Sequence, residues 1–202
     1  MLKHYKKTLL SVCLFFSYYS FILFLSILLV VYIPLFYQLN YSISGDNYEE
    51  LKPYTNELIS YFLYFNVLDD TWSQSEQKHY DDVRFLYSFI FVISVMLCLL
   101  LRFFKKYLSY VSFSKYSLVL LYSHFLVFLD FEFFWDSIFH PLLFSNTYWI
   151  IYPGEISYLL FSYDFFITSI IFIVIINTII HGSVIFKDVI ISYSKKLWNQ
   201  FK

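Results

Sequence analysis

A long uncharged stretch near the N-terminus limits the possible folds of this chain more than any other feature. No Asp, Glu, Lys, Arg or His occurs from Thr8 to Gly45, whereas residues 1–7 are basic. A helix crosses the hydrocarbon core of a bilayer in about 20 residues. The stretch therefore predicts a membrane-spanning helix over about residues 9–35. We expect this helix to be retained, because its apolar run is longer than that of a cleaved signal peptide and no A-x-A site follows.

Three further apolar segments predict spans at about residues 85–101, 110–129 and 165–186. The chain is 59% hydrophobic with a mean hydropathy of +0.62, more apolar surface than a soluble domain of this length hides. We therefore predict an all-α membrane protein with four transmembrane helices, forming one membrane domain over residues 1–202. The remaining segments, 36–84 and 130–164, are expected to form a small extracellular cap.

Within the first cap segment, apolar residues recur at helical spacing from Glu49 to Asn66, including Leu58, Phe62 and Phe65. This pattern predicts a short amphipathic helix lying on the surface. The sequence alone leaves open whether the segment is a helix or part of a cap that contains strands.

The charges predict how the chain is oriented. The N-terminal tail, the 102–115 loop and the C-terminal tail hold three, four and four of the 14 Lys and Arg residues. The two predicted cap segments and their flanks hold 14 of the 15 Asp and Glu residues. Basic residues accumulate on the cytoplasmic side of membrane proteins. Both termini are therefore expected in the cytoplasm and both cap segments outside.

Several classes of function lack sequence support. The chain has no C-x-x-C, G-x-G-x-x-G, G-x-x-x-x-G-K or G-x-S-x-G pattern and no basic patch, which argues against nucleotide, nucleic-acid and serine-hydrolase chemistry. Cys13 and Cys98 both lie inside apolar segments, where small buried residues are a better interpretation than a disulfide or a metal pair. We expect no cofactor.

Two histidines in the polar cap segments are the candidates for chemistry. His79 lies in SEQKHYDDVR, with Glu76 three residues before it and Asp82 three residues after it. If the second span continues outward as a helix, these three side chains share a face, and either carboxylate could orient the imidazole. His140 lies in IFHPLLFSNTYW, where Pro141 is expected to end any helix just before it. Imidazole gives and takes a proton near neutral pH.

Other interpretations of the histidines remain open. A histidine at a membrane interface is often only a polar aromatic group at a wet surface. His124 and His181, inside the third and fourth predicted spans, are expected to pack or to form hydrogen bonds between helices. A divalent ion could also be bound by His79, Asp81, Asp82, His140 and several other acidic residues. Their spacing matches no metal-binding pattern, so no metal is predicted.

Three sequence blocks resemble the bacterial lipoprotein intramolecular transacylase family (Lit). Residues Glu76 to Arg84 fit its pattern E-x-x-H-x-x-D-V-(K/R). The second block is similar to F-H-x-x-F-F-P-N-x-x-W and comprises Phe139, His140, Phe144, Asn146 and Trp149. The third, residues 160–166, looks like L-F-P-x-x-F-F before the last span. Ser145 and Ser162 stand where the family has proline, and Leu143 replaces a phenylalanine. These departures bear on the backbone around His140.

The resemblance implies an enzyme that moves the sn-2 acyl chain of a diacylglyceryl-cysteine lipoprotein onto its N-terminal α-amino group. It implies His79 and His140 as the two catalytic residues, at the outer face of a bacterial plasma membrane. The expected substrate-binding or positioning residues are Glu76, Asp82, Arg84, Phe139, Phe144, Asn146 and Trp149. The expected partners are the diacylated lipoprotein and membrane lipid. A metal-dependent lipid hydrolase and a non-catalytic membrane scaffold are the alternatives.

Overall fold

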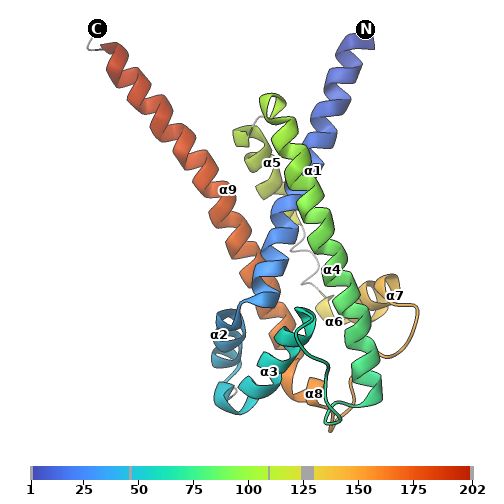
Figure 1. The fold of residues 1–202 in the computed structure, drawn as a ribbon. Helices are drawn as coiled ribbons and strands as arrows, with labels where there is room; N and C mark the ends of the chain where they lie inside the picture. The colour runs from blue at the N-terminus through green and yellow to red at the C-terminus, as the bar shows by residue number, and fades with distance from the viewer. Residues whose placement is uncertain (1, 46, 109, 124–129, 201–202) are drawn as a thin grey trace. The chain divides into compact units, whose positions relative to one another are not determined.

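Helices are the regular secondary structure in the computed structural model, which describes residues 2–45, 47–108, 110–123 and 130–200 (Figure 1). None of these residues forms a strand, so the all-helical prediction is confirmed for this part of the chain. In chain order the elements are α1 (Leu2–Tyr32), α2 (Pro34–Ser44), α3 (Tyr48–Phe62), α4 (Gln74–Phe103), η1 (Lys105–Tyr107), α5 (Tyr110–Ser123), α6 (Phe131–Phe134), η3 (Trp135–Phe139), α7 (His140–Leu143), α8 (Ile156–Leu160) and α9 (Tyr163–Gln200).

Three helices are long and apolar enough to cross a membrane: residues Thr8–Tyr32 of α1, all of α4, and Tyr163–Ile191 of α9. They overlap three of the predicted spans. The other predicted span, 110–129, begins with α5, whose 14 residues reach only about 21 Å at 1.5 Å per residue. Its remainder, residues 124–129 with His124, lies outside the described residues. A fourth span therefore stays a prediction.

The first span is shorter than predicted because Pro34 divides it. α1 ends at Tyr32, and Ile33 takes an extended conformation with φ −99° and ψ 112°. A residue before proline is pushed away from helical geometry. Proline itself is favoured in the first turn of a helix, where its missing N–H costs nothing. Pro34 therefore begins α2 instead of extending the helix predicted over residues 9–35.

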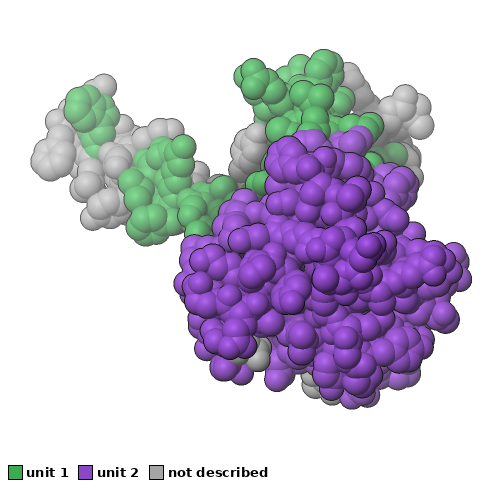
Figure 2. Space-filling model, turned by 60° about the horizontal axis from the view of Figure 1, so that its bottom comes forward, with its two compact units in different colours: residues 1–26, 93–124, 174–202 green, residues 27–92, 125–173 purple. Residues whose placement is uncertain are grey.

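The chain divides into two compact units (Figure 2). Unit 1 comprises residues 1–26, 93–124 and 174–202, and unit 2 comprises residues 27–92 and 125–173. The two candidate catalytic histidines both belong to unit 2. The site can therefore be described within one unit, whereas the single membrane domain predicted from the sequence stays a prediction.

Unit 1 has a small core that mixes apolar and polar side chains. Leu14, Tyr18 and Phe113 are buried in it, and the Tyr18 and Ser114 hydroxyl oxygens lie 2.9 Å apart. His181 is fully buried, with its ring 5.6 Å from the Tyr18 ring. This contact agrees with the packing role predicted for His181. Neither of its ring nitrogens has a hydrogen-bond partner among the described residues.

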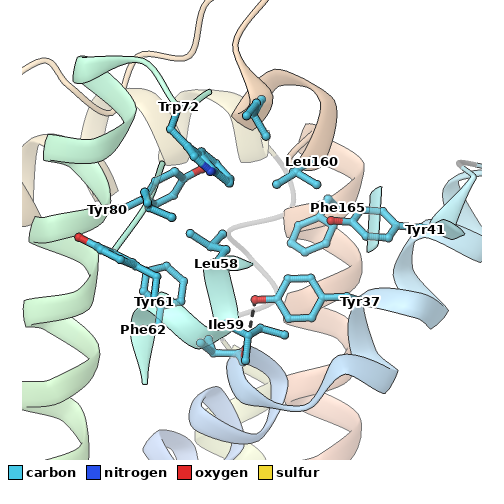
Figure 3. Close-up of a cluster of buried hydrophobic side chains, with 13 residues drawn as sticks. Tyr37, Tyr41, Leu58, Ile59, Tyr61, Phe62, Trp72, Tyr80, Leu160 and Phe165 are labelled. Carbon is cyan, nitrogen blue, oxygen red and sulfur yellow. Dashed lines mark hydrogen bonds between the residues drawn. The ribbon is translucent and has the colours of Figure 1, made fainter. Parts of the chain in front are cut away.

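Aromatic side chains form most of the core of unit 2 (Figure 3). Helix α3 packs against α2 and α8. Trp72 lies in this core, and its ring meets that of Tyr80 on α4 edge-on at 5.4 Å. The same core contains Leu58 of α3, so it connects the start of α4 with α3. The Tyr37 hydroxyl donates to the Val31 carbonyl at 3.1 Å. Burial of these large rings contributes most of the stability that holds the start of α4 in place.

Helix α3 confirms the amphipathic helix predicted in the first cap segment. Its buried face includes Leu58, Ile59 and Phe62, and the Asn47 side chain caps its start by accepting from the Glu49 N–H. One residue was assigned wrongly. The helix ends at Phe62, so Phe65 lies beyond it and is 81% exposed.

Candidate active site

The polar sequence around His79 is helical and forms the first turns of α4. Ser73 caps this helix: its Oγ accepts from the Glu76 N–H at 3.2 Å, while Glu76 Oε2 accepts from the Ser73 N–H at 2.7 Å. This reciprocal pair is a capping box, and the S-x-x-E pattern indicates it in the sequence. Glu76, His79 and Asp82 all lie within α4, which begins at Gln74. His79 is therefore about one helical turn after Glu76 and one turn before Asp82.

The Glu76 carboxylate joins α4 to α8, although its side chain is only 3% exposed. Glu76 Oε1 accepts from the Ser157 N–H at 2.7 Å and from the Ser157 hydroxyl at 2.6 Å. Since Ser157 uses its proton here, the Tyr80 hydroxyl donates to Ser157 Oγ at 2.6 Å. A buried carboxylate is stable only where donors surround it in this way. Glu76 therefore supports His79 through the backbone of α4.

A second carboxylate strengthens the same junction. The Ser73 hydroxyl donates to Glu155 Oε1 at 2.7 Å, and Glu155 Oε2 accepts from the Tyr152 N–H at 2.7 Å. Glu155, Ser157 and Tyr80 were not among the predicted site residues. The capping pattern gives a local signal for Glu76. No local signal shows that Ser157 meets it, because the two residues are 81 positions apart.

His140 begins α7 directly after η3, which is a π-helical turn. The prediction that Pro141 ends a helix before it is wrong, because the chain stays helical through Pro141 to Leu143. In a continuous α-helix the proline ring would collide with the carbonyl four residues earlier. The wider π turn avoids this collision, and proline then lies in the first turn of α7. Turns of this kind are frequent at functional sites.

The carbonyl of Trp135 holds His140 in one tautomer. It accepts from the backbone N–H of His140, and its oxygen also lies 3.0 Å from His140 Nδ1. A carbonyl oxygen can only accept, so in the neutral ring Nδ1 carries the proton. The lone pair is therefore on Nε2, which leaves that nitrogen able to accept a proton.

Aromatic rings enclose His140, which is 6% exposed. Its ring stacks on Trp149 with centroids 4.6 Å apart and an interplanar angle of 19°. Trp135 meets it edge-on at 4.7 Å, and Phe139 stacks in turn on Trp135 at 4.7 Å. Phe144 lies 5.8 Å from the imidazole. The three aromatic residues predicted for the site, Phe139, Phe144 and Trp149, therefore lie around His140.

The structure brings His79 and His140 together. Their ring centroids are 6.2 Å apart, and Phe144 contacts both, meeting His79 edge-on at 5.1 Å. His79 Nδ1 is buried and has no hydrogen-bond partner within the described part of the chain. This unpartnered ring nitrogen, beside a second imidazole, is free to form a hydrogen bond with a polar group of a bound molecule.

Burial lowers the pKa of His140 below its ordinary value of 6.5. The Trp135 carbonyl and the Asp136 carboxylate act in the opposite direction, because both favour the protonated ring. The effect of burial is larger. His140 is therefore neutral at pH 7 and can act as a base.

Asn146 links the loop after α7 to α4. Its Nδ2 donates to Asp82 Oδ2 at 2.8 Å, and its Oδ1 accepts from the Tyr148 N–H at 3.0 Å. The Lys78 ammonium lies 4.9 Å from the centre of the Tyr148 ring. These contacts hold the loop that carries Trp149 against the helix that carries the other histidine. Asp82 and Asn146, both predicted as site residues, are thus paired with each other.

Arg84 makes its contacts on another face of α4. It donates to Asp81 at 2.8 Å, and its guanidinium lies 4.0 Å from the centre of the Tyr61 ring and 4.7 Å from that of Tyr64. At about 100° per residue it is roughly 140° around the helix from His79. These contacts connect Arg84 with α3 and the loop after it, not with the two imidazoles.

The described residues contain no group of three or more His, Cys, Asp and Glu side chains placed to hold a metal ion. Two imidazoles with an Asp–Asn pair nearby are instead suited to moving protons and positioning a polar substrate. The fold and the site together define an integral membrane protein with a pair of neighbouring histidines suited to acid–base chemistry.

The family model described as lipoprotein intramolecular transacylase Lit matches residues 12–166. The chain belongs to the lipoprotein intramolecular transacylase Lit family, whose members are acyltransferases. The family predicted from the three sequence blocks and the predicted enzyme class are therefore confirmed.

Solved structures show the same fold. The membrane-integral lipoprotein intramolecular transacylase Lit from Bacillus cereus is 20% identical, with a TM-score of 0.66 over 98% of this chain and 99% of that one. A histidine-to-alanine mutant of that protein is 21% identical, with a TM-score of 0.66 and 98% of each chain covered. A histidine-to-arginine mutant is 22% identical, with a TM-score of 0.67 over 100% and 97%. No curated protein sequence matches the chain.

Proposed function

We propose that this chain moves the sn-2 acyl chain of a diacylglyceryl-cysteine lipoprotein onto the α-amino group of the same cysteine. The product is the N-acylated lyso form with one acyl chain left on glycerol. The observation that carries the proposal is the pair of imidazoles, His79 and His140, 6.2 Å apart in a chain of the transacylase family. Donor ester and acceptor amine belong to one molecule, so the enzyme needs no Ser or Cys nucleophile.

The reaction asks for proton transfers that two imidazoles can divide. The neutral amine attacks the ester carbonyl, and the carbonyl oxygen becomes an oxyanion. The nitrogen loses a proton as the amide C–N bond forms. The ester C–O bond breaks and the glycerol oxygen takes up a proton, so no water is consumed and no proton is gained or lost overall. General acid–base catalysis of this kind contributes typically about 10²–10⁴-fold in rate.

The tautomer of His140 suggests how the tasks are divided. Its Nδ1–H is held by the Trp135 carbonyl, and Nε2 is the basic nitrogen. We assign the general base to His140 Nε2. His79 then stabilises the oxyanion or protonates the leaving glycerol oxygen, as a neutral imidazole N–H can do. Asp82 and Asn146 are positioning residues, because their hydrogen bond ties the loop after α7 to the helix that carries His79.

Aromatic side chains around the histidines favour transfer over hydrolysis. Trp149 covers one face of His140, and Phe144 touches both imidazoles. Apolar rings at the reacting centre exclude water, which would otherwise compete for the ester. Bringing amine and ester together in one bound molecule is the main entropic task and is worth at most about 7–11 kcal/mol of barrier.

We further propose four membrane spans, with both termini in the cytoplasm and the site on the outer face of a bacterial plasma membrane. The distribution of charge supports this orientation, because basic residues gather in the two tails and the 102–115 loop. Residues 36–84 and 130–164 then form an extracellular cap. The lipoprotein substrate and membrane lipid would reach the site from the outer leaflet.

Mass spectrometry of an N-terminal lipopeptide tests the proposed function. Cells that lack a transacylase would be compared with and without this chain, with expression checked by immunoblot. Because transacylation conserves mass, the fragment ions must show one acyl chain on the cysteine nitrogen when the chain is present. A free amine with both chains on glycerol would favour a non-catalytic scaffold. The loss of one acyl mass, abolished by EDTA, would favour a metal-dependent hydrolase.

The lowered pKa of His140 predicts the pH profile of the reaction. A histidine with a pKa below 6.5 stays neutral and basic as pH falls, and its action as a base is lost only when pH passes through its folded-state pKa. The substrate amine must also be neutral to attack, and its ordinary pKa of about 7.7–8 sets a first acid limb of kcat/KM for a synthetic diacylated lipopeptide. We expect a second acid limb, that of His140, below pH 6.5. Rates would be measured between about pH 5 and 8. A second limb above pH 6.5, once the limb of the substrate amine is accounted for, would contradict the assigned base.

Asn146→Asp is expected to slow the reaction about 10-fold or more. The change removes the donor to Asp82 and sets a second carboxylate 2.8 Å from the first. A hydrogen bond to a charged group is worth about 1.5–3 kcal/mol, and 1.4 kcal/mol is tenfold. Initial rates would be compared with those of Ser145→Ala, an exposed neighbour. Equal rates for the two variants would mean that the Asp82–Asn146 pair does not position the site.

A further inference from the structure

The end of α3 has an unusual residue at its turning point. The Phe65 N–H donates to the Ser60 carbonyl at 2.9 Å, and the Tyr64 N–H donates to the Tyr61 carbonyl at 3.0 Å. These two bonds define a Schellman motif, which places one residue in the left-handed conformation. That residue is Tyr64, with φ 63°, the single non-glycine with positive φ among the described residues. Glycine usually takes this place, since a side chain makes the conformation unfavourable.

The side chain of Tyr64 explains why a tyrosine is present. Ser88 uses its hydroxyl proton on the Arg84 carbonyl at 2.8 Å, so the Tyr64 hydroxyl donates to Ser88 Oγ at 2.9 Å. The Arg84 guanidinium lies 4.7 Å from the centre of the Tyr64 ring. Glycine could make neither contact. Tyr64 thus fixes the loop after α3 against α4 at the position of Ser88.

The loop directs its apolar side chains outward. A Schellman motif usually folds its last residue back onto the helix, but that residue here is Phe65, which is 81% exposed. Val67 is 79% exposed, and Leu63 is also exposed. Phe85, on the α4 segment that Tyr64 contacts, is 72% exposed. Apolar residues grouped in this way mark a surface that something apolar covers.

The position of Ser88 on α4 indicates what covers the loop. α4 is a candidate span, and its uncharged run extends from Phe85 to Leu101 between Arg84 and Arg102. Ser88 therefore lies about 6 Å along the helix from Arg84, inside the apolar run. An arginine between tyrosine rings is typical of the boundary between headgroups and hydrocarbon. The loop anchored at Ser88 is consequently level with the edge of the hydrocarbon.

We propose that residues 63–67, with Phe65 and Val67 at their tip, insert among the acyl chains of the bilayer and anchor α3 to the membrane. This segment is a site for lipid acyl chains, distinct from the imidazole pair and independent of the acyltransferase chemistry. Tyr64 sets the depth, because its hydrogen bond to Ser88 couples the loop to the membrane-spanning helix.

Spin-label accessibility tests the insertion in the full-length protein reconstituted in phosphatidylglycerol–phosphatidylethanolamine vesicles. The native thiols are removed by Cys13→Ala and Cys98→Ala, and single labels are introduced at Phe65→Cys and Val67→Cys. Asp70→Cys is the matched control, since Asp70 is exposed, precedes α4 and lies on the same loop. Oxygen partitions into hydrocarbon, whereas a nickel chelate stays in water.

The proposal predicts an oxygen-to-nickel accessibility ratio several times higher at positions 65 and 67 than at position 70. A nickel accessibility at position 65 equal to that at position 70 would place the loop in water and overturn it. Low accessibility to both reagents would also overturn it, because the loop would then be covered by protein. Adding Tyr64→Gly should increase label mobility at position 65 and lower the ratio, since the tie to Ser88 is lost.

Discussion

His79→Ala and His140→Ala are each expected to lower the rate of transacylation by a factor of about 10²–10⁴, the contribution typical of a general acid or base. The two imidazoles lie 6.2 Å apart and share contact with Phe144. They are proposed to act on one proton-transfer sequence, so the double variant should be hardly slower than either single variant. Initial rates of N-acylation of a synthetic lipopeptide, measured with purified protein, would give these factors.

Loss of folding must be separated from loss of catalysis, because His140 is buried. His79→Gln and His140→Gln keep most of the side-chain volume and should unfold near the wild-type temperature. Leu142→Ala provides a control beside His140, since Leu142 is 79% exposed on α7 and should have full activity. Wild-type rates in either folded glutamine variant would remove that histidine from the proposed mechanism.

Glu76→Ala is expected to have the largest effect on stability. It leaves three donors without an acceptor: the buried Ser157 N–H and hydroxyl, and the part-buried Ser73 N–H. Each unsatisfied buried group costs about 1–3 kcal/mol, so the two Ser157 donors alone predict a loss of at least about 2 kcal/mol. The start of α4 should loosen, and the rate should fall with it because His79 is one turn away. Thermal unfolding in detergent, followed by tryptophan fluorescence, measures the first effect.

Two further variants distinguish the Glu76 network from a general effect of charge removal. Glu76→Gln retains one acceptor oxygen and should be destabilised less than Glu76→Ala. Ser157→Ala removes one of the partners, so its effect should be much smaller when Glu76 is already alanine. If Glu76→Ala unfolded at the wild-type temperature, the network could not be what holds α4 to α8.

The proposed catalytic residues were easier to predict from the sequence than the residues that hold them in place. His79 and Asp82 lie three residues apart, so helical spacing predicts their proximity once the second span is continued outward. The resemblance of the second sequence block to the family pattern predicted His140 and its aromatic neighbours as site residues. No pattern in the sequence predicts that Ser157 and Glu155 contact the start of α4. They reach α4 only because α8 packs against α3, and such a contact depends on the whole core of unit 2.

Backbone geometry accounts for the remaining differences between prediction and structure. The first span was predicted to run past Pro34, and Pro141 was predicted to end a helix, but both prolines begin helices instead. The reason is that proline stops only the helix before it and favours the one that follows. The exposed position of Phe65 could not be predicted from helical spacing, since it depends on the left-handed turn at Tyr64.

A crossover measurement tests the central claim most directly. Two diacylated lipopeptides would be mixed with the purified protein, one with a light peptide and a light sn-2 chain, the other with an isotopically heavy peptide and a heavy sn-2 chain. Fragmentation mass spectrometry would then identify which acyl chain each cysteine nitrogen carries. Intramolecular transfer predicts only light chains on light peptides and heavy chains on heavy peptides. Exchange of chains between the two peptides, or release of free fatty acid, would contradict it.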